Sequence, residues 1–172
     1  MVNKISILLI LFITAGIGYT IYGFFAVDKN PDIVTVERFN DQDPILLDQY
    51  IGQKKTILQF VAVPCECCSF SMPFIKQFSE EQDEIEVISI IFYGKRNEIQ
   101  EKFEDEYQAT HLYGLDLDRS IANHYGVSVS PTYVFLDEDG NNLGAYPYII
   151  INAEELLVRY NDAYDKFHIE GE

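Results

Sequence analysis

The chain has 172 residues, which is enough for one ordinary domain and an accessory segment but hardly for two full domains. Its apolar fraction of 48% is ordinary for a globular protein, so a packed core can form. The 12 basic residues stand against 28 acidic ones, and the formal charge of -16 argues against nucleic acid as a partner, because binding phosphates needs a cationic surface.

The N-terminal segment is the first to stand out. Residues 5–27 contain no charged residue and, at about 1.5 Å rise per residue, are long enough for a helix that spans a hydrocarbon core of roughly 30 Å. The run is longer than the apolar part of a cleaved signal peptide, so it favours a retained transmembrane signal anchor. Lys4 precedes it and Asp28 follows it, which predicts that residues 1–4 are cytoplasmic and that the bulk of the chain is outside the cytoplasm.

The rest of the chain reads as a linker at 28–32 and one extracytoplasmic domain at 33–172, which we expect to be held at the cell membrane by the single span. Alternating strands and helices near its start predict parallel strands joined by crossover helices, and a hairpin near its end predicts an antiparallel edge. The fold class is therefore α/β, a mixed β-sheet flanked by helices on both faces. Strands are expected at 33–40, 54–63 and 85–93, with a short strand within 111–118 and a pair within 131–149 that is joined at Asp139-Gly140. Helices are expected at 69–82, at 96–108 on the surface and, as a short helix, at 119–127. The last helix is expected at 152–167, with Asn152 as its N-cap.

All three cysteines, Cys65, Cys67 and Cys68, lie within four positions, where the strand at 54–63 meets the following helix. The first turn of a helix has unpaired N–H groups and the positive end of the helix dipole, which together stabilise a thiolate. Cys65 at that terminus would be an exposed nucleophile. Cys68, one turn further, would be partly buried and could attack a mixed disulfide formed at Cys65.

A second signal is Pro131, which enters a strand shortly after Gly126. Proline in a strand costs a hydrogen bond of the sheet and needs a reason. A cis Ser130–Pro131 bond beside the cysteines would supply one, because it could present backbone groups to an incoming extended chain.

With both signals in place, residues 33–167 resemble the thioredoxin-like superfamily, and most closely the membrane-anchored TlpA/ResA-type thiol–disulfide oxidoreductases. The resemblance is carried by an ordered set of segments: GQKKTILQF at 52–60, the C-x-x-C pair, Met72-Pro73, LDLDRSIANHYGV at 115–127 and SPTYVFLDEDG at 130–140.

The resemblance implies a role for each matching residue. Cys65 is expected to be the nucleophile and Cys68 the resolving cysteine of a redox-active disulfide, and Pro131 is expected to be cis. Ser130 should help to shape the substrate-docking groove. Pro64 and Glu66 are further candidates for substrate binding.

Some family features are absent. The tryptophan that usually precedes the first cysteine is Pro64, the buried acid of many thioredoxins is Gln59, and the glutamate of ResA-type proteins is Ser71. Glu66 is the only carboxylate inside the motif, and its charge would raise the pKa of Cys65 against the effect of the helix dipole. We therefore expect a modestly acidic Cys65 and a reducing couple.

Cys67 leaves several alternatives open. It could be a tolerated small residue, an accessory thiol that forms another disulfide with Cys65 or with a partner, or the third thiolate of a metal site. A copper carrier of the Sco-like type would need a wider cysteine spacing, and a zinc site would call for a histidine, but His111, His124 and His168 show no motif spacing. A peroxiredoxin-like peroxidase would need Thr where Ala62 stands. A purely structural C-x-x-C disulfide closes too small a loop to stabilise much.

The sequence therefore predicts a membrane-anchored thiol–disulfide oxidoreductase that acts on cysteine-containing extracytoplasmic proteins. We expect a membrane thiol donor or acceptor as a further partner, and no metal or organic cofactor. The alternative is a thiol-based copper or zinc binding or delivery module on the same fold.

Overall fold

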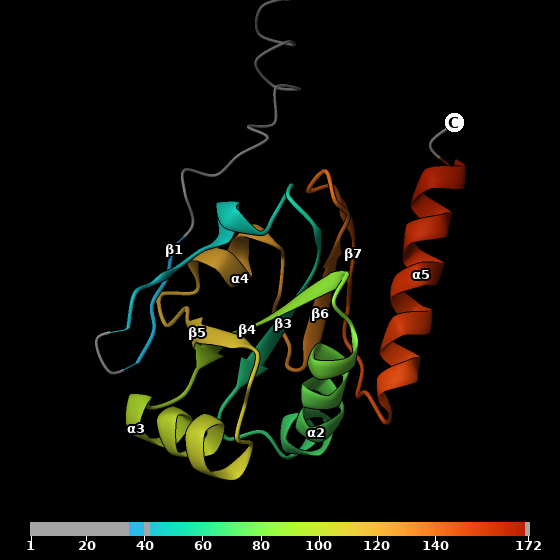
Figure 1. Ribbon diagram of the computed structural model, residues 1–172. Coiled ribbons are helices and arrows are strands. Elements are labelled where there is room, and N and C mark those ends of the chain that lie inside the picture. The colour runs from blue at the N-terminus through green and yellow to red at the C-terminus, as the bar shows by residue number, and fades with distance from the viewer. Residues whose placement is uncertain (1–34, 40–41, 171–172) are drawn as a thin grey trace, which may run out of the picture. The chain divides into compact units, whose positions relative to one another are not determined.

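A five-stranded sheet organises the protein, and its strands follow the order β5-β4-β3-β6-β7 (Figure 1). The structure is a computed structural model that describes residues 35–39 and 42–170, which fall within one compact unit, Ile33–Glu172. The strands of this sheet are β3 (Lys55–Ala62), β4 (Ile85–Tyr93), β5 (Leu112–Leu115), β6 (Thr132–Leu136) and β7 (Asn142–Tyr146).

The directions of the strands are mixed, as the sequence predicted. β3, β4 and β5 are parallel, whereas β6 pairs antiparallel with β3 and β7 pairs antiparallel with β6. Parallel neighbours need crossover connections. Helix α2 (Glu66–Glu81) joins β3 to β4, and helix α3 (Arg96–Gln100) with the π-helical turn η2 (Glu101–Glu106) joins β4 to β5.

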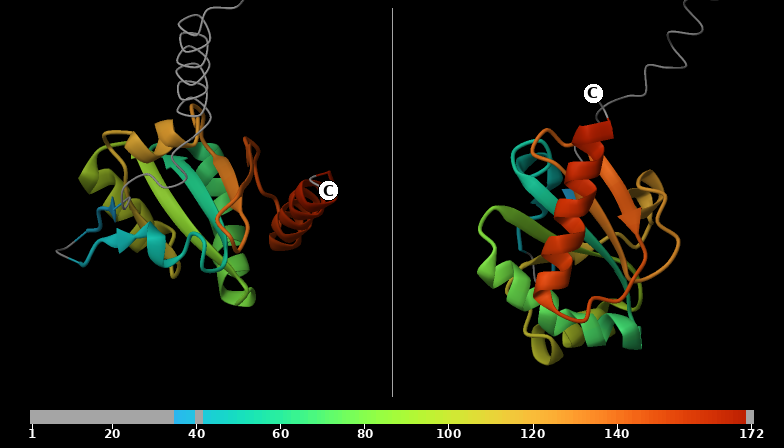
Figure 2. Two further views of the ribbon diagram at one scale, coloured as in Figure 1. Left: turned by 90° about the horizontal axis from the view of Figure 1, so that it is seen from above. Right: turned by 90° about the vertical axis from the view of Figure 1, so that its right-hand side faces the viewer.

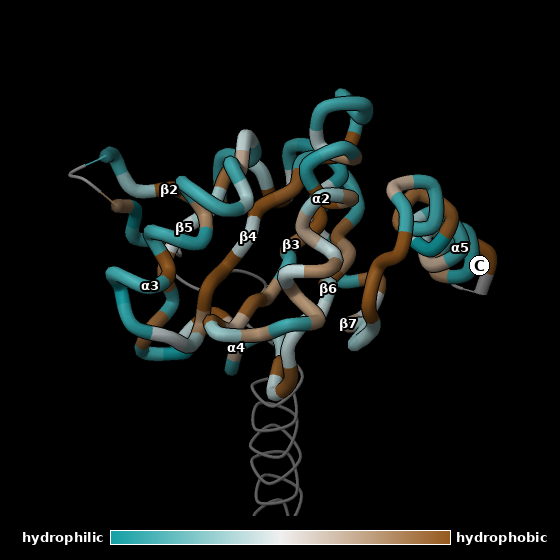
Figure 3. The backbone as a smooth tube through the Cα atoms, turned by 90° about the horizontal axis from the view of Figure 1, so that it is seen from below, coloured by the Kyte–Doolittle hydropathy of each residue, from teal (hydrophilic) through white to brown (hydrophobic). Residues whose placement is uncertain are grey.

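Both faces of the central strand are covered, which explains its continuous apolar sequence. Leu58 and Phe60 of β3 pack with helix α4 (Ser120–His124), the 3₁₀ turn η1 (Leu47–Gln49) and the small β1–β2 sheet (Thr35–Val36 with Ile45–Leu46). Ile57 of the same strand lies on the opposite face with α2 and the C-terminal helix α5 (Ala153–Glu170). The views in Figure 2 show α5 beside the sheet, and Figure 3 shows hydrophobic residues along the inner strands.

The predicted hairpin and helix cap are both confirmed. The backbone N–H of Gly140 donates to the Asp137 carbonyl at 3.1 Å, and Gly140 has a φ of +81°, which glycine adopts without steric cost. At the start of α5, Asn152 Oδ1 accepts a hydrogen bond from the Glu155 backbone N–H at 2.7 Å.

The surface helix expected at 96–108 is helical from Arg96 to Glu106, and its departure from the prediction is in its hydrogen-bonding pattern. The α-helix ends at Gln100 and continues as the π-helical turn, and the side chains of Ile99 and Phe103 are fully buried. These two side chains are one helical turn apart and insert into the core beside α2, so this connection is part of the packing.

Two expectations concern residues at the N-terminus. The strand expected at 33–40 is limited, among the residues described, to Thr35–Val36 and a bridge between Glu37 and Leu115. The signal anchor and the linker, 5–32, lie outside the described residues. No helix in the described ranges is both long and apolar enough to cross a membrane.

A buried polar row crosses the sheet beneath α2. Ser89 Oγ donates to Gln59 Oε1 at 2.6 Å and lies 2.8 Å from Nε2 of His111. His111 is buried, and its Nδ1 has no hydrogen-bond partner among the described residues. Burial lowers the pKa of His111 to about 4, because the charged imidazolium would lose its hydration.

This lowered pKa predicts a pH-dependent stability. Between pH 6.5 and about 4 the unfolded chain binds a proton at His111 that the folded chain does not. The free energy of unfolding should therefore fall as the pH falls through this window, by about 3 kcal/mol in total. Denaturant unfolding of the full chain at several pH values measures it. His111→Gln should remove this part of the pH dependence, and exposed His124→Gln should retain it. Parallel curves for wild type and His111→Gln would contradict the assignment.

Candidate active site

Cys65 occupies the N-cap of α2, directly after the central strand. Its backbone is extended, with φ -153° and ψ 108°, and its Sγ accepts a hydrogen bond from the backbone N–H of Cys68 at 3.2 Å. The sulfur thus takes the place that a serine or aspartate oxygen takes at an ordinary N-cap. An N–H group and the positive end of the helix dipole therefore stabilise negative charge on this atom.

Cys65 and Cys68 are joined by a disulfide, with their Cα atoms 5.3 Å apart. The two sulfurs differ in access, because Cys65 is half-buried whereas Cys68 is fully buried. A thiol arriving from solvent can therefore reach Cys65 but not Cys68. The pairing and the order of exposure are those that the sequence predicted, but each cysteine is more buried than expected.

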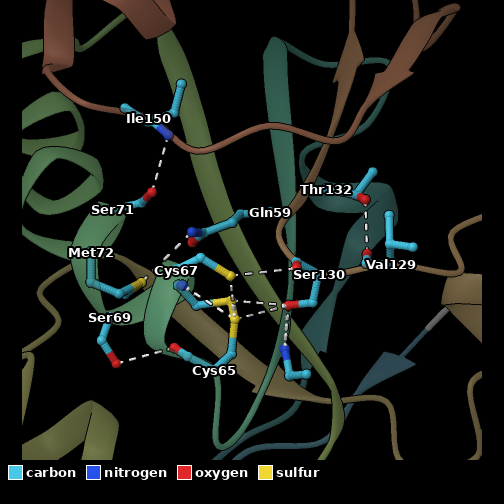
Figure 4. The surroundings of a disulfide bond; sticks show 12 residues. Gln59, Cys65, Cys67, Ser69, Ser71, Met72, Val129, Ser130, Thr132 and Ile150 are labelled. Carbon is cyan, nitrogen blue, oxygen red and sulfur yellow. Dashed lines mark hydrogen bonds between the residues drawn. A yellow bond between two sulfur atoms is a disulfide. The ribbon is translucent and has the colours of Figure 1, made fainter.

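The loop before β6 approaches the disulfide from the neighbouring strand, as Figure 4 shows. The Ser130–Pro131 bond is cis, and Pro131 is buried. The hydroxyl of Ser130 accepts a hydrogen bond from the Ala62 backbone N–H at 2.8 Å and lies 3.0 Å from Cys68 Sγ and 3.9 Å from Cys65 Sγ. Because its oxygen is occupied as an acceptor by Ala62, its own hydrogen is available to a sulfur.

Cys67 is the free thiol, and it lies inside the site. Its Sγ is 3.0 Å from Cys65 Sγ and donates towards the backbone carbonyl of Ser130 at 3.8 Å. The three sulfurs lie within 4.8 Å of one another, and among the described residues no histidine or carboxylate joins them. A metal at this position would thus have thiolates as its only protein ligands, and only after reduction of the disulfide.

The buried surroundings of the disulfide are polar but neutral. Gln59, at the position of the usual buried acid, bonds Ser89 and donates to Met72 Sδ at 3.6 Å. Ser71, at the position of the ResA-type glutamate, accepts a hydrogen bond from the Ile150 backbone N–H at 3.0 Å. Tyr133 pairs with Gln59 across β3 and β6, and burial raises the pKa of its hydroxyl to about 12. None of these side chains carries charge at neutral pH.

A groove of about 630 Å³ lies next to Cys65, at the carboxyl ends of the parallel strands. Pro64 forms one of its walls, and Tyr93 and Leu117 line it with exposed apolar side chains. Three charged side chains also line it: Arg119, and Lys95 with Glu98, which form an ion pair at 2.8 Å. Crevices at the carboxyl ends of parallel strands are the common ligand sites of open α/β sheets.

The structure also places the other predicted site residues, whose roles in substrate binding stay predictions. Glu66 is exposed at the first position of α2, and Pro64 precedes the N-cap with a cis Val63–Pro64 bond that the sequence did not suggest. Sequence reasoning also missed Tyr107, whose hydroxyl lies 2.6 Å from Ser69 Oγ. Ser69 in turn donates to the Cys65 carbonyl at 3.2 Å. No sequence signal points to Tyr107, since its placement depends on the π-helical turn.

Comparison with known proteins agrees with this geometry. Residues 26–143 match the Redoxin family. The chain is 27% identical to the thiol-disulfide oxidoreductase ResA of Geobacillus thermodenitrificans over an alignment of 142 residues. This alignment covers 77% of this chain and 79% of that protein. A secreted disulfide oxidoreductase of Mycobacterium tuberculosis, homologous to E. coli DsbE, has a similar structure (TM-score 0.65, 21% identity, 75% of this chain and 95% of that chain). StoA of Bacillus subtilis also has a similar structure (TM-score 0.61, 21% identity), and the match covers 74% of this chain and 96% of StoA.

The match to the family spans well over half of the sequence, and the solved structures share the fold of the described residues. The half-buried disulfide at the start of α2 is the chemical group that such proteins need. The chain therefore belongs to the Redoxin family, as a thiol–disulfide oxidoreductase with a thioredoxin-like fold.

Proposed function

We propose that the protein reduces disulfides in extracytoplasmic proteins through the Cys65–Cys68 couple. The observation that carries this proposal is the unequal access of the two bonded sulfurs, one reachable at the N-cap of α2 and one buried against Ser130. This asymmetry gives each cysteine a separate step.

In the first step the Cys65 thiolate attacks one sulfur of a substrate disulfide. A bond forms between Cys65 and the substrate, and the other substrate sulfur leaves as a thiolate. In the second step Cys68, as its thiolate, attacks Cys65 Sγ. The Cys65–Cys68 disulfide forms and the second substrate thiolate leaves. Two electrons have passed to the substrate, and the protons of the two cysteines end on its thiols.

Ser130 contributes to the step in which a thiol donor reduces the Cys65–Cys68 disulfide of the protein. A donor thiolate that attacks Cys65 expels Cys68 as a buried thiolate, and the Ser130 hydroxyl is placed 3.0 Å away to donate a hydrogen bond to it. Hydrogen bonds to charged groups contribute about 1.5–3 kcal/mol. The same hydroxyl is held by the Ala62 N–H, so it needs no rearrangement to act.

A protein substrate suits the surface around Cys65. Large apolar side chains are exposed on the elements that flank the disulfide and in the groove beside Pro64: Phe70 in α2, Val129 in the loop before β6, and Tyr93 and Leu117 in the groove. Exposed apolar clusters mark places where a partner chain docks. An extended segment with apolar residues beside its cysteine would bury these side chains and bring its sulfur to Cys65.

The neutral surroundings support a reducing couple. A strongly oxidising couple needs an unusually stable nucleophile thiolate. Among the described residues, Cys65 Sγ accepts one backbone N–H bond, and no hydrogen bond links a cationic side chain to any of the three sulfurs. Glu66 follows Cys65 directly and adds a negative charge to the same turn.

The apolar run at 5–27 supports attachment of this domain to the cell membrane from outside the cytoplasm. A tethered reductase in an oxidising compartment needs a source of electrons, and a membrane thiol donor would supply them. Its dithiol would attack Cys65 and leave as a disulfide, so that the cycle balances.

The reductase proposal is tested with the full chain, insulin disulfides as the substrate and dithiothreitol as the electron source. Cys65→Ser should abolish catalysis. Ser130→Ala should slow the reduction of the chain's own disulfide by dithiothreitol about tenfold, because the expelled Cys68 thiolate loses its hydrogen bond. Ser130→Thr should restore the rate, and Ser128→Ala, an exposed site in the same loop, is the matched control. Full activity of Cys65→Ser would contradict the assignment of the nucleophile.

Membrane attachment is tested by fractionation of a bacterial host that expresses the chain. The full chain should stay with the membranes after an alkaline wash, because a spanning helix is not extracted as a peripheral protein is. A chain that begins at Ile33 should be released. Protease added to the outer side of the membrane should digest the domain. A full chain found in the soluble fraction would rule out the anchor.

A further inference from the structure

We propose that Cys67 is a second resolving thiol, which competes with Cys68 for the mixed disulfide at Cys65. This inference rests on the proposed function, since it requires that Cys65 forms mixed disulfides with substrates. It assigns a chemical step to the one cysteine that the C-x-x-C mechanism does not use.

The N-cap geometry places Cys65 Sγ between two thiols. Because the backbone of Cys65 is extended, its side chain folds back over the first turn of α2 and bonds the Cys68 N–H. The second and third residues after this N-cap lie in the same first turn of α2. Here both are cysteines, and Cys67 Sγ lies 3.0 Å from Cys65 Sγ.

The sulfur of Cys67 faces the site. It is half-buried, and its sulfur faces the Ser130 carbonyl at 3.8 Å as well as Cys65, as the close-up in Figure 4 shows. The same loop therefore contacts both candidate resolving sulfurs: the Ser130 hydroxyl contacts Cys68, and the Ser130 carbonyl contacts Cys67.

Cys67 also borders the resting disulfide, since its Sγ lies 3.0 Å from Cys65 Sγ and the three sulfurs lie within 4.8 Å of one another. Attack of Cys67 on Cys65 would exchange the Cys65–Cys68 bond for a Cys65–Cys67 bond, and attack of Cys68 would reverse it, so the two disulfides can interconvert. The structure holds the Cys65–Cys68 form.

A mixed disulfide changes this geometry. The bond at Cys65 then runs outward to the substrate sulfur, and Cys67 and Cys68 both lie on the protein side of Cys65. Attack by Cys67 forms a Cys65–Cys67 disulfide and expels the substrate thiolate, which takes up the proton that Cys67 loses. Cys68 then attacks Cys65, forms the Cys65–Cys68 disulfide of the structure and returns Cys67 to a free thiol. No oxidant or reductant beyond the substrate is consumed.

One consequence distinguishes this protein from an ordinary C-x-x-C oxidoreductase. Replacing the second cysteine of such a pair normally leaves a mixed disulfide with no thiol to resolve it. Here Cys68→Ser should still release its substrate, and only the loss of both Cys67 and Cys68 should trap the complex.

The test follows the release of glutathione from Cys65. The reduced full chain is reacted with oxidised glutathione, the excess is removed, and samples are quenched with acid for intact-mass and peptide mapping. Cys68→Ser should lose its glutathione at least about ten times faster than Cys67→Ser/Cys68→Ser and should yield a Cys65–Cys67 disulfide. Cys67→Ser should resolve through Cys68. Equal persistence of the adduct in Cys68→Ser and in the double variant would overturn the proposal.

Two further measurements keep the result decisive. Cys68→Ala repeats the test without a new hydroxyl beside Ser130, and it should release glutathione as Cys68→Ser does. Rapid quenching of the wild-type chain should show a transient Cys65–Cys67 disulfide before the Cys65–Cys68 bond, and its absence at every time point would count against the proposal. A wild-type chain that forms no adduct or disulfide at Cys65 would instead refute the proposed function itself.

Discussion

The hydrogen bond from the Cys68 backbone N–H to Cys65 Sγ is the interaction on which the rest of the site depends. It satisfies a donor at the start of α2 and places the sulfur of Cys65 over the first turn. That position gives the sulfur a stabilised charge, a bonded partner one turn along and a free thiol at 3.0 Å. A side chain without an acceptor at this point would remove the cap and the nucleophile together.

The order of the sheet supplies the other half of the site. The cysteines follow the carboxyl end of β3, the central strand. Because β6 pairs antiparallel with β3, β6 begins at the end of the sheet where β3 stops. The loop before β6 therefore comes alongside α2, and the Ala62 N–H fixes the Ser130 hydroxyl against the disulfide. Cys68 and Ser130, 62 positions apart in the sequence, thus meet because β3 and β6 are hydrogen-bonded neighbours.

Local signals and the family resemblance let the sequence predict much of this arrangement. The strand at 85–93 and the N-cap at Asn152 depend on neighbouring residues, and both are present. The Cys65–Cys68 disulfide and the cis bond before Pro131, which the resemblance implied, are present too. The direction of the Cys67 side chain and the contact between Tyr107 and Ser69 depend on packing between distant elements. Periodicity does not contain that information.

The central claim is that Cys65 and Cys68 form a reducing couple while Cys67 stays a free thiol at equilibrium. The most direct measurement equilibrates the full chain in dithiothreitol or glutathione buffers, then traps and maps its thiols by mass spectrometry. We expect a single two-electron transition that joins Cys65 to Cys68, at about -270 mV or below. A midpoint near about -120 mV would contradict the reducing direction. Three thiols that form no disulfide and stay protected until a chelator is added would contradict the redox function and favour metal binding.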